Sequence, residues 1–225
     1  DLYAGALVTE LRARQRDVEV FGMGGPRMAA AGADVVTDFT PLSVTGLTEA
    51  IRVVPRSLAA IRHLVDVART RRPDVFVAID FPDFNFRLME RLSALGVPVV
   101  YYISPQLWAW RPGRIETMKR FVTRVLVIFP FEEAVYARAG IAAEFVGHPL
   151  IDLVPHMAPR DAFLHQHGLD GSARTIAVLP GSRTSELRRI LPDLVSACSL
   201  IARRVPGAQF RSEEHTSELQ SHHDL

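Results

Sequence analysis

The chain has 225 residues, of which 48% are hydrophobic, enough for a buried core in one large or two small domains. Its net charge of +1 gives no overall positive field for binding nucleic acid, so we expect no nucleic-acid partner. The single cysteine, Cys198, excludes an internal disulfide and fits a reducing compartment. No apolar run reaches the roughly 20 residues that a membrane-spanning helix needs.

The first 40 residues alternate between helical and extended patterns. Residues 22–26 (Gly-Met-Gly-Gly-Pro) resemble a dinucleotide-binding fingerprint only loosely, because Pro26 breaks the spacing, and a tight strand-to-helix turn is the better interpretation. The predicted elements are a helix over 2–16, a strand over 18–21, a helix over 27–31 and a strand over 34–37.

Residues 44–58 form a basic, amphipathic segment in which Glu49 is the one acid. Such a segment can lie on an anionic membrane surface, or it can cover the sheet as an ordinary helix. We expect Pro55 to bend or break it, and a helix to continue over 58–71. In the membrane interpretation the docking residues are Val44, Leu47, Ile51, Val54 and Leu58.

A buried strand followed by an acid lies near the middle of the chain. Residues 75–79 are Val-Phe-Val-Ala-Ile, an unalternating run typical of a strand covered on both faces in a parallel sheet. Asp80 follows at the carboxyl end, where open α/β sheets bind ligands. Asp80 is therefore either an active-site carboxylate or a cap for its own loop, and Asp83 can cap a helix over 84–95.

The next segment continues the same alternation, with strands predicted over 97–103, 122–128 and 144–146 and a helix over 130–139. Two tryptophans, Trp108 and Trp110, stand beside Arg111. They form either a sugar- or lipid-binding platform or a hydrophobic plug.

A second strand-turn-helix unit begins after a segment punctuated by proline and glycine. The turn Pro180-Gly181-Ser182-Arg183 joins a strand over 175–179 to a helix over 184–204. Such a turn places a helix N-terminus where it can hold a phosphate, and Arg183 adds a charged fork.

Alternating strands and helices predict an α/β fold with parallel sheets. We assign residues 1–150 to a first α/β domain, 151–172 to a linker and 173–210 to the start of a second domain. No metal site is predicted: His165 and His167 diverge on a helix because they are two residues apart.

Residues 211–225 depart from this pattern, because polarity rises and the apolar period disappears. Back-translation of residues 211–221 yields codons that look like a sequencing-library adapter. We therefore predict a non-native, adapter-derived tail that makes few contacts with the core, and we exclude it from the functional interpretation.

Together these motifs resemble lipid-A-disaccharide synthase, a bacterial glycosyltransferase family. Asp1 matches the last residue of the family's N-terminal Gly-Glu-x-Ser-Gly-Asp loop, and the family continues well beyond residue 210, so we expect an internal fragment. The matching stretches are residues 25–28, 73–77, 79–80, 82–85, 104–105, 108–111, 130–132, 147–148 and 179–183.

The resemblance implies two facing Rossmann-like lobes of the GT-B type, the first for the acceptor and the second for the UDP-sugar. The implied reaction transfers 2,3-diacylglucosamine, with inversion, from its UDP conjugate to 2,3-diacylglucosamine 1-phosphate. It releases UDP and forms a β-1,6-linked disaccharide of lipid A. The family acts at the cytoplasmic face of the inner membrane and needs no metal or other cofactor, and we expect a homodimer of the full-length protein.

The resemblance also assigns residue roles. Asp80 matches the family's proposed catalytic base, which would take a proton from the acceptor hydroxyl. Gly181, Ser182 and Arg183 match the turn that would stabilise the charge on the leaving UDP. Further substrate-binding candidates are Asn85, Trp108, Trp110 and His148, although His148 is alternatively hinge packing and the tryptophans are alternatively core.

Two competing interpretations remain open. A sugar-nucleotide epimerase with the same two-lobed plan would also use an acidic strand end and a phosphate turn, although the motif at 108–111 is not expected there. In the other, non-enzyme interpretation, the chain is a folded but inactive acceptor domain.

Overall fold

The computed structural model describes residues 1–38, 47–107, 113–153, 158–181 and 184–212, without the side chains of 47–53 and 184–185. The chain divides into two compact units, Asp1–Val154 and Pro155–Leu225, which are described separately. None of the helices in the described ranges combines the length and the apolar character needed to cross a membrane.

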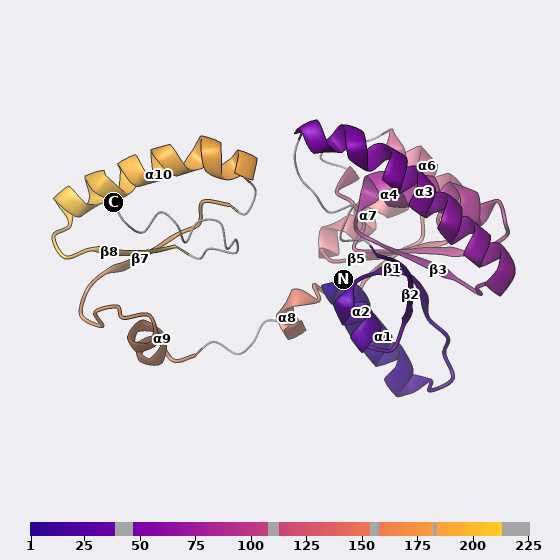
Figure 1. Ribbon diagram of the computed structural model, residues 1–225, viewed down its shortest axis with the longest axis horizontal. Coiled ribbons are helices and arrows are strands. Elements are labelled where there is room, and N and C mark those ends of the chain that lie inside the picture. The colour runs from indigo at the N-terminus through magenta and orange to yellow at the C-terminus, as the bar shows by residue number, and fades with distance from the viewer. Residues whose placement is uncertain (39–46, 108–112, 154–157, 182–183, 213–225) are drawn as a thin grey trace. The chain divides into compact units, whose positions relative to one another are not determined.

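The first unit alternates strands and helices. β1 pairs with β2 (Figure 1), and β3, β4, β5 and β6 form a four-stranded sheet in that order. Every pair is parallel. The predicted α/β class with parallel sheets is confirmed. The elements are α1 (Leu2–Arg14), β1 (Phe21–Gly24), α2 (Pro26–Ala30), β2 (Asp34–Asp38), α3 (Leu47–Arg71), β3 (Phe76–Ile79), α4 (Pro82–Ser93), β4 (Val99–Tyr102), α6 (Arg114–Phe121), β5 (Arg124–Val127), α7 (Pro130–Arg138), β6 (Ala143–Phe145) and α8 (Leu150–Leu153).

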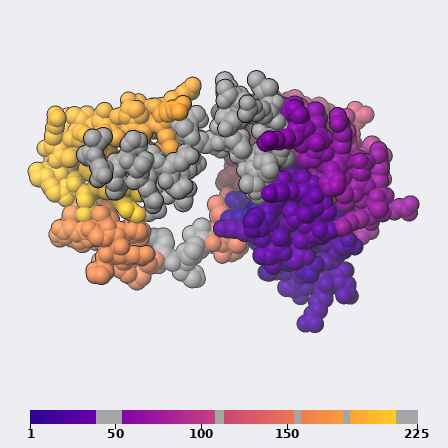
Figure 2. All heavy atoms as spheres, viewed as in Figure 1, coloured from indigo at the N-terminus to yellow at the C-terminus, as the bar shows by residue number. Residues whose placement is uncertain are grey.

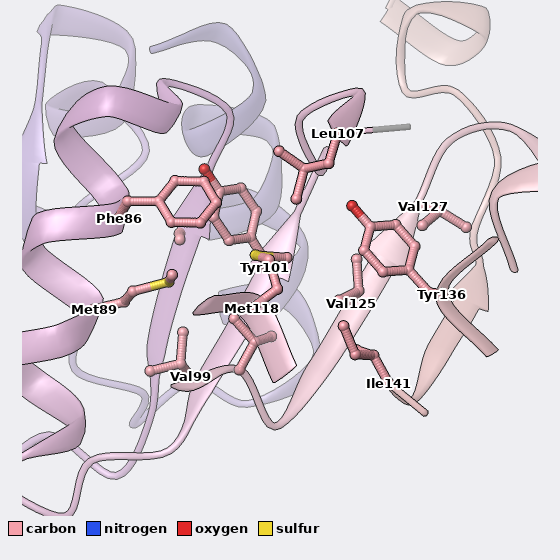
Figure 3. Packing of buried hydrophobic residues seen from close by; sticks show 12 residues of the cluster. Phe86, Met89, Val99, Tyr101, Leu107, Met118, Val125, Val127, Tyr136 and Ile141 are labelled. Carbon is pink, nitrogen blue, oxygen red and sulfur yellow. The ribbon is translucent and has the colours of Figure 1, made fainter. Parts of the chain in front are cut away.

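One face of the four-stranded sheet carries the largest hydrophobic cluster of the described residues. Val99 and Tyr101 of β4 and Val125 and Val127 of β5 are fully buried, and they pack with residues of α4, α6 and α7 (Figure 3). Alternate residues are buried because successive side chains of a strand point to opposite faces. The opposite face is only half-buried. In β3 itself Ala78 is buried and the other three residues are half-buried, so the cover expected on both faces of this strand is incomplete.

Helix α4 buries two of its faces. Phe84, Leu88 and Leu92, spaced four residues apart, pack with α3, while Phe86 and Met89 enter the core beside the sheet. This double burial fixes α4 against the sheet, and α4 begins directly after the loop that carries Asp80. The helix starts at Pro82, earlier than predicted, because proline suits the first helical position.

Helix α3 runs through Pro55 without the break that the sequence suggests. A proline inside a helix costs about 3 kcal/mol. After Pro55, however, Ile61, Leu64 and Val65 are buried in the cluster shared with α4, and this packing offsets the cost. Met23 of β1 and Val36 of β2 pack on the same cluster, and Figure 2 shows these segments in one continuous body.

The glycine-rich segment after residue 20 belongs to a strand. β1 is Phe21–Gly24, so the strand expected at 18–21 lies three residues later, where its backbone pairs with β2. Helix α2 follows directly, and the Asp1 carboxylate accepts hydrogen bonds at 3.0 Å from the backbone N–H groups of Gly25, Arg27 and Met28. The Asp1 side chain therefore caps α2, which supports the interpretation of residues 22–26 as a tight strand-to-helix turn.

The second unit contains α9 (Arg160–Gln166), β7 (Thr175–Val178), α10 (Thr184–Arg204) and β8 (Gln209–Ser212). β7 and β8 are parallel and are joined through α10. Arg211 and Ser212 lie in β8, half-buried, so the strand extends two residues beyond the predicted end of the native sequence. The reason is that pairing with β7 uses backbone groups, which every residue supplies. Residues 213–225 lie outside the described ranges, and their adapter origin stays a prediction.

Candidate active site

The loop after β3 holds Asp80 in a left-handed backbone conformation. The backbone angle φ is 46° at Asp80 and 44° at Phe81, a region that residues other than glycine rarely adopt. Such strain costs on the order of 1–3 kcal/mol per residue, and it persists only where the surroundings enforce it. The exposed Asp80 side chain is therefore positioned at an energetic cost, as is common in active sites.

Two buried side chains, Asn85 and Tyr101, donate hydrogen bonds to the backbone of this loop. Asn85 Nδ2 donates hydrogen bonds to the carbonyl oxygens of Asp80 (2.7 Å) and Ile79 (3.3 Å). The Tyr101 hydroxyl donates to the same Asp80 carbonyl at 2.8 Å, and the Asp80 N–H donates to the Tyr102 carbonyl at 3.2 Å. Asn85, predicted to bind substrate, thus supports the loop, and its own contact with substrate stays a prediction.

The chemistry of Tyr101 suits this supporting role. Burial raises the pKa of Tyr101 far above its ordinary value, and the nearby Asp80 charge raises the pKa further. The phenol therefore stays protonated at physiological pH and remains a hydrogen-bond donor to the Asp80 carbonyl.

The neighbouring strand β4 also ends in a strained turn. Ile103 has a φ of 56°, which is unusual for a β-branched residue. The buried Ser104 hydroxyl hydrogen-bonds with the Tyr136 hydroxyl, which also donates to the Pro105 carbonyl at 3.3 Å. Burial raises the pKa of Tyr136 to about 12, so this hydroxyl is protonated at physiological pH. Two adjacent parallel strands thus end in left-handed turns at the same edge of the sheet.

A cavity of about 500 Å³ lies at this carboxyl edge, a volume that suits a small-molecule ligand. Figure 3 shows the Tyr101 and Tyr136 hydroxyls on the side of the core where Leu107 lies, and Leu107 lines the cavity. The lining residues come from α1, α6 and the segments after β3, β4 and β5. They are Tyr3, Asp80, Pro82, Asp83, Ile103, Ser104, Pro105, Gln106, Leu107, Arg114, Ile128, Phe129 and Glu132.

The cavity lining contains both signs of charge. Arg114, at the start of α6, pairs with Asp83 of α4 at 2.5 Å, and its guanidinium lies 4.9 Å from the centre of the Phe86 ring. Glu132, only 1% exposed, accepts a hydrogen bond at 3.1 Å from the backbone N–H of Phe129 and caps α7. Asp80, Asp83, Glu132 and Arg114 therefore surround one volume.

His148 lies just beyond the carboxyl end of β6. Its Nδ1 accepts a hydrogen bond from the backbone N–H of Leu150 at 3.2 Å, so a neutral His148 carries its proton on Nε2. The ring makes an edge contact with Phe129, a cavity-lining residue, at 6.2 Å between centroids. His148 thus caps α8 next to the cavity, and a direct contact with substrate stays a prediction.

The predicted phosphate turn of the second unit is described in part. Gly181 has a φ of 99°, and a Cβ there would lie 2.7 Å from Oε2 of Glu186 in the first turn of α10. The positive φ favours glycine, whereas the contact is with the end of the flexible Glu186 side chain, which can move away. Four other predicted ligand residues lie outside the described ranges: Ser182, Arg183, Trp108 and Trp110.

The predicted docking segment falls mostly within α3. Val44 lies outside the described residues, and Leu47 and Ile51 belong to α3 without described side chains. Val54 is 48% exposed and Leu58 is half-buried, whereas Ile61, two turns after Val54, is fully buried. The described part of α3 thus passes from an exposed to a buried surface along its length.

Three residues of the site have no assigned role in the sequence-based prediction. Tyr101 and Arg114 carried no signal of their own, because a tyrosine in a strand and an arginine at a helix start are common. Glu132 stands in the motif at 130–132, three residues after the N-cap, but the N-cap is Phe129 and not the serine or threonine of a capping box, so the sequence alone does not signal this cap. Within the described ranges, no group of three or more His, Cys, Asp or Glu residues could hold a metal ion.

Solved structures with a similar fold include two UDP-sugar epimerases. A putative UDP-N-acetylglucosamine 2-epimerase from Listeria monocytogenes has a TM-score of 0.63 at 12% identity over 95% of this chain and 59% of its own. UDP-GlcNAc 2-epimerase from Neisseria meningitidis has a TM-score of 0.56 at 10% identity over 94% of this chain and 62% of its own. At such identities the likeness shows the GT-B type of fold alone.

Sequence comparison identifies the family. The profile described as lipid-A-disaccharide synthetase matches residues 1–223. The lipid-A-disaccharide synthase of Myxococcus xanthus is 48% identical over 93% of this chain, and that of Koribacter versatilis is 48% identical over 88%. The chain spans about half the length of these curated relatives, 55% and 52% respectively. The chain therefore belongs to the lipid-A-disaccharide synthetase family.

Proposed function

We propose that the chain supplies the acceptor-binding side of a lipid-A-disaccharide synthase, with Asp80 as the catalytic base. One observation carries the proposal: the fold holds Asp80 in a strained turn at the edge of a 500 Å³ cavity in a member of this family. The whole enzyme would transfer 2,3-diacylglucosamine from its UDP conjugate to 2,3-diacylglucosamine 1-phosphate, with release of UDP.

The proposed chemistry is a single displacement. A sugar hydroxyl is a poor nucleophile until a base removes its proton, and the Asp80 carboxylate is exposed to the cavity to do so. The hydroxyl oxygen then attacks the anomeric carbon as the bond to UDP breaks, which inverts the configuration. This displacement needs no enzyme nucleophile, and the proposal includes no metal or organic cofactor.

A chimera tests the proposed function. Residues 1–210 of this chain would replace the matched 209-residue segment of the Myxococcus xanthus synthase. With both acylated substrates, the chimera should form the disaccharide and release UDP in equal amounts. A folded chimera that forms no disaccharide, beside an active Myxococcus enzyme, would refute the proposal. The 225-residue chain by itself should show no turnover.

The epimerase alternative has less support. The two epimerases resemble the chain in fold at 12% identity or less, whereas the named synthases are 48% identical. The chimera also separates the two reactions, because an epimerase would convert the UDP-sugar without consuming an acceptor.

For the donor, we propose that Gly181, Ser182 and Arg183 bind the UDP phosphates at the start of α10. The left-handed Gly181 and the helix that begins at Thr184 support this proposal. Arg183→Ala in the chimera should weaken UDP binding by about 2 kcal/mol, because a charge-assisted hydrogen bond is lost. Calorimetry with UDP measures this change, and an unchanged affinity would contradict the assignment.

We also propose that residues 44–58 dock the enzyme on the inner membrane, since both proposed substrates carry acyl chains. The exposure of Val54, at 48%, supports the idea. Replacing Leu47, Ile51 and Val54 by serine should reduce binding to anionic vesicles in a sedimentation assay and leave the melting temperature nearly unchanged. Each nearby basic residue contributes about 1 kcal/mol, so binding should also weaken with salt.

The same helix provides the control for this experiment. Ile61→Ser changes a side chain with 0% exposure and should unfold the protein. If the triple serine variant unfolds as well, these residues contribute to the core, and if it binds vesicles as wild type does, the segment does not dock. Either result would refute the docking proposal. We further propose that the whole enzyme associates peripherally with the cytoplasmic face of the inner membrane and forms a homodimer.

A further inference from the structure

Arg114 is the one basic side chain among the described residues that line the cavity. The same lining contains three carboxylates, those of Asp80, Asp83 and Glu132. A cavity with this lining would repel an anionic ligand if Arg114 were neutral, because like charges in a confined site disfavour binding strongly. Among the described lining residues, Arg114 is therefore the cationic side chain that an anionic ligand would meet.

The structure holds the Arg114 guanidinium in place but leaves donors available. Asp83 accepts a hydrogen bond from Nη2 at 2.5 Å, and the Phe86 ring lies 4.9 Å from the guanidinium carbon. A guanidinium has five N–H donors in a planar fork, and Asp83 is the one acceptor recorded for it among the described residues. Such a fork matches two oxygens of a phosphate, and holding it in advance reduces the entropy lost on binding.

Stabilisation of the fold does not explain this arrangement well. The side chain of Asp83 is 74% exposed, and ion pairs with so exposed a partner contribute little to stability. The pair does fix the position of Arg114 beside Asp83, at the start of α4 and three residues after Asp80. Its effect is thus to place a cation close to the proposed base.

We propose that Arg114 is the anion-binding residue of this cavity and that it binds the phosphate of a sugar 1-phosphate whose hydroxyl reacts at Asp80. This assignment rests on the proposed function and deepens it, because it gives the two ends of the acceptor separate partners. Arg114 determines specificity: it selects a phosphorylated acceptor over the same sugar without phosphate. Asp83 positions Arg114 and gives up part of its hold when the phosphate binds.

Binding of N-acetylglucosamine 1-phosphate to the 225-residue chain tests the proposal without any need for turnover. Titration calorimetry should detect saturable binding, and Arg114→Gln should weaken it by about tenfold or more. Arg120→Gln provides the matched control, because Arg120 is an exposed arginine of the same helix outside the cavity lining. N-acetylglucosamine without phosphate should bind wild type and Arg114→Gln equally weakly.

A second variant separates recognition from folding. Asp83→Asn removes the competing negative charge, while the asparagine amide oxygen can still accept the hydrogen bond from Arg114 Nη2 and keep the guanidinium in position. The phosphate should therefore bind at least as tightly as it does to wild type. If the pair were merely structural, Arg114→Gln and Asp83→Asn would weaken binding equally, and that result would overturn the proposal. No saturable binding to wild type at millimolar concentrations, or unchanged binding in Arg114→Gln, would overturn it too.

Two further measurements show whether Arg114 binds the acceptor phosphate or the phosphates of UDP. They also separate this inference from the proposed function. In the chimera, UDP affinity should not change with Arg114→Gln, because UDP is assigned to the second unit. A parallel loss of UDP binding would contradict the assignment. Phosphate-dependent binding through Arg114 together with an inactive chimera would refute the proposed function alone. An active chimera whose acceptor KM does not respond to Arg114→Gln would refute the Arg114 assignment alone.

Discussion

Asp80→Asn in the chimera should lower the rate of disaccharide formation by roughly two to four orders of magnitude, the usual contribution of a general base. Asparagine has nearly the same shape and tolerates the left-handed backbone better than most residues. The loop and its hydrogen bonds should therefore persist, and the loss should reflect the missing carboxylate. The initial rate of UDP release at saturating substrates measures the effect.

Asp74→Asn is the control for this experiment, because Asp74 is an exposed aspartate that lies before the same strand, on the side opposite to Asp80 in sequence. It should leave the rate unchanged. An Asp80→Asn enzyme with near-normal turnover would remove Asp80 from the proposed mechanism. An equal loss in both variants would show a general effect of charge and would have the same consequence.

The two donors to the Asp80 carbonyl should depend on each other. Asn85→Ala removes the hydrogen bonds to the Asp80 and Ile79 carbonyls, and Tyr101→Phe removes one to Asp80. Each should lower the free energy of unfolding by about 1–3 kcal/mol. The double variant should lose more than the sum, because only then does the Asp80 carbonyl lack both side-chain donors. Urea unfolding of the 225-residue chain measures all three values.

The same variants should reduce activity in the chimera, since the loop aims the carboxylate. A displacement of the base by about 1 Å can cost a hundredfold in rate. Tyr102→Phe is the matched control, because Tyr102 is the next residue of β4 and its side chain makes no hydrogen bond to the Asp80 carbonyl. Strictly additive stability losses, or full activity in the double variant, would show that the two residues do not position Asp80.

Much of the local structure was predictable from residue patterns alone. The apolar run before Asp80 indicated a strand of a parallel sheet, and β3 and β4 are parallel as expected. The position of Asp80 after that strand followed from the same run. The turn at Pro180-Gly181 was predictable because a proline and a glycine stand between a strand pattern and a helix pattern. Gly181 has the positive φ that glycine tolerates best. Each of these features depends on neighbours within a few residues.

Some local predictions shifted once tertiary contacts were included. β1 begins at Phe21 because β2 offers its pairing partner there, and α3 continues through Pro55 because its later turns are buried. Asn85 belongs to a motif that suggests ligand contact, yet its amide supports the Asp80 loop. Periodicity describes how a segment is buried but does not identify what covers it.

The sequence by itself determined the parallel α/β class, the family motifs and the place of Asp80 at the end of a strand. Only the tertiary structure decided which distant side chains act on Asp80. Tyr101 reaches the Asp80 carbonyl across 21 residues of sequence, and Arg114 reaches Asp83 across 31. These contacts depend on the register of β3 with β4 and on the packing of α6 against α4. Register and packing arise from the whole core, so no local pattern around Tyr101 or Arg114 encodes them.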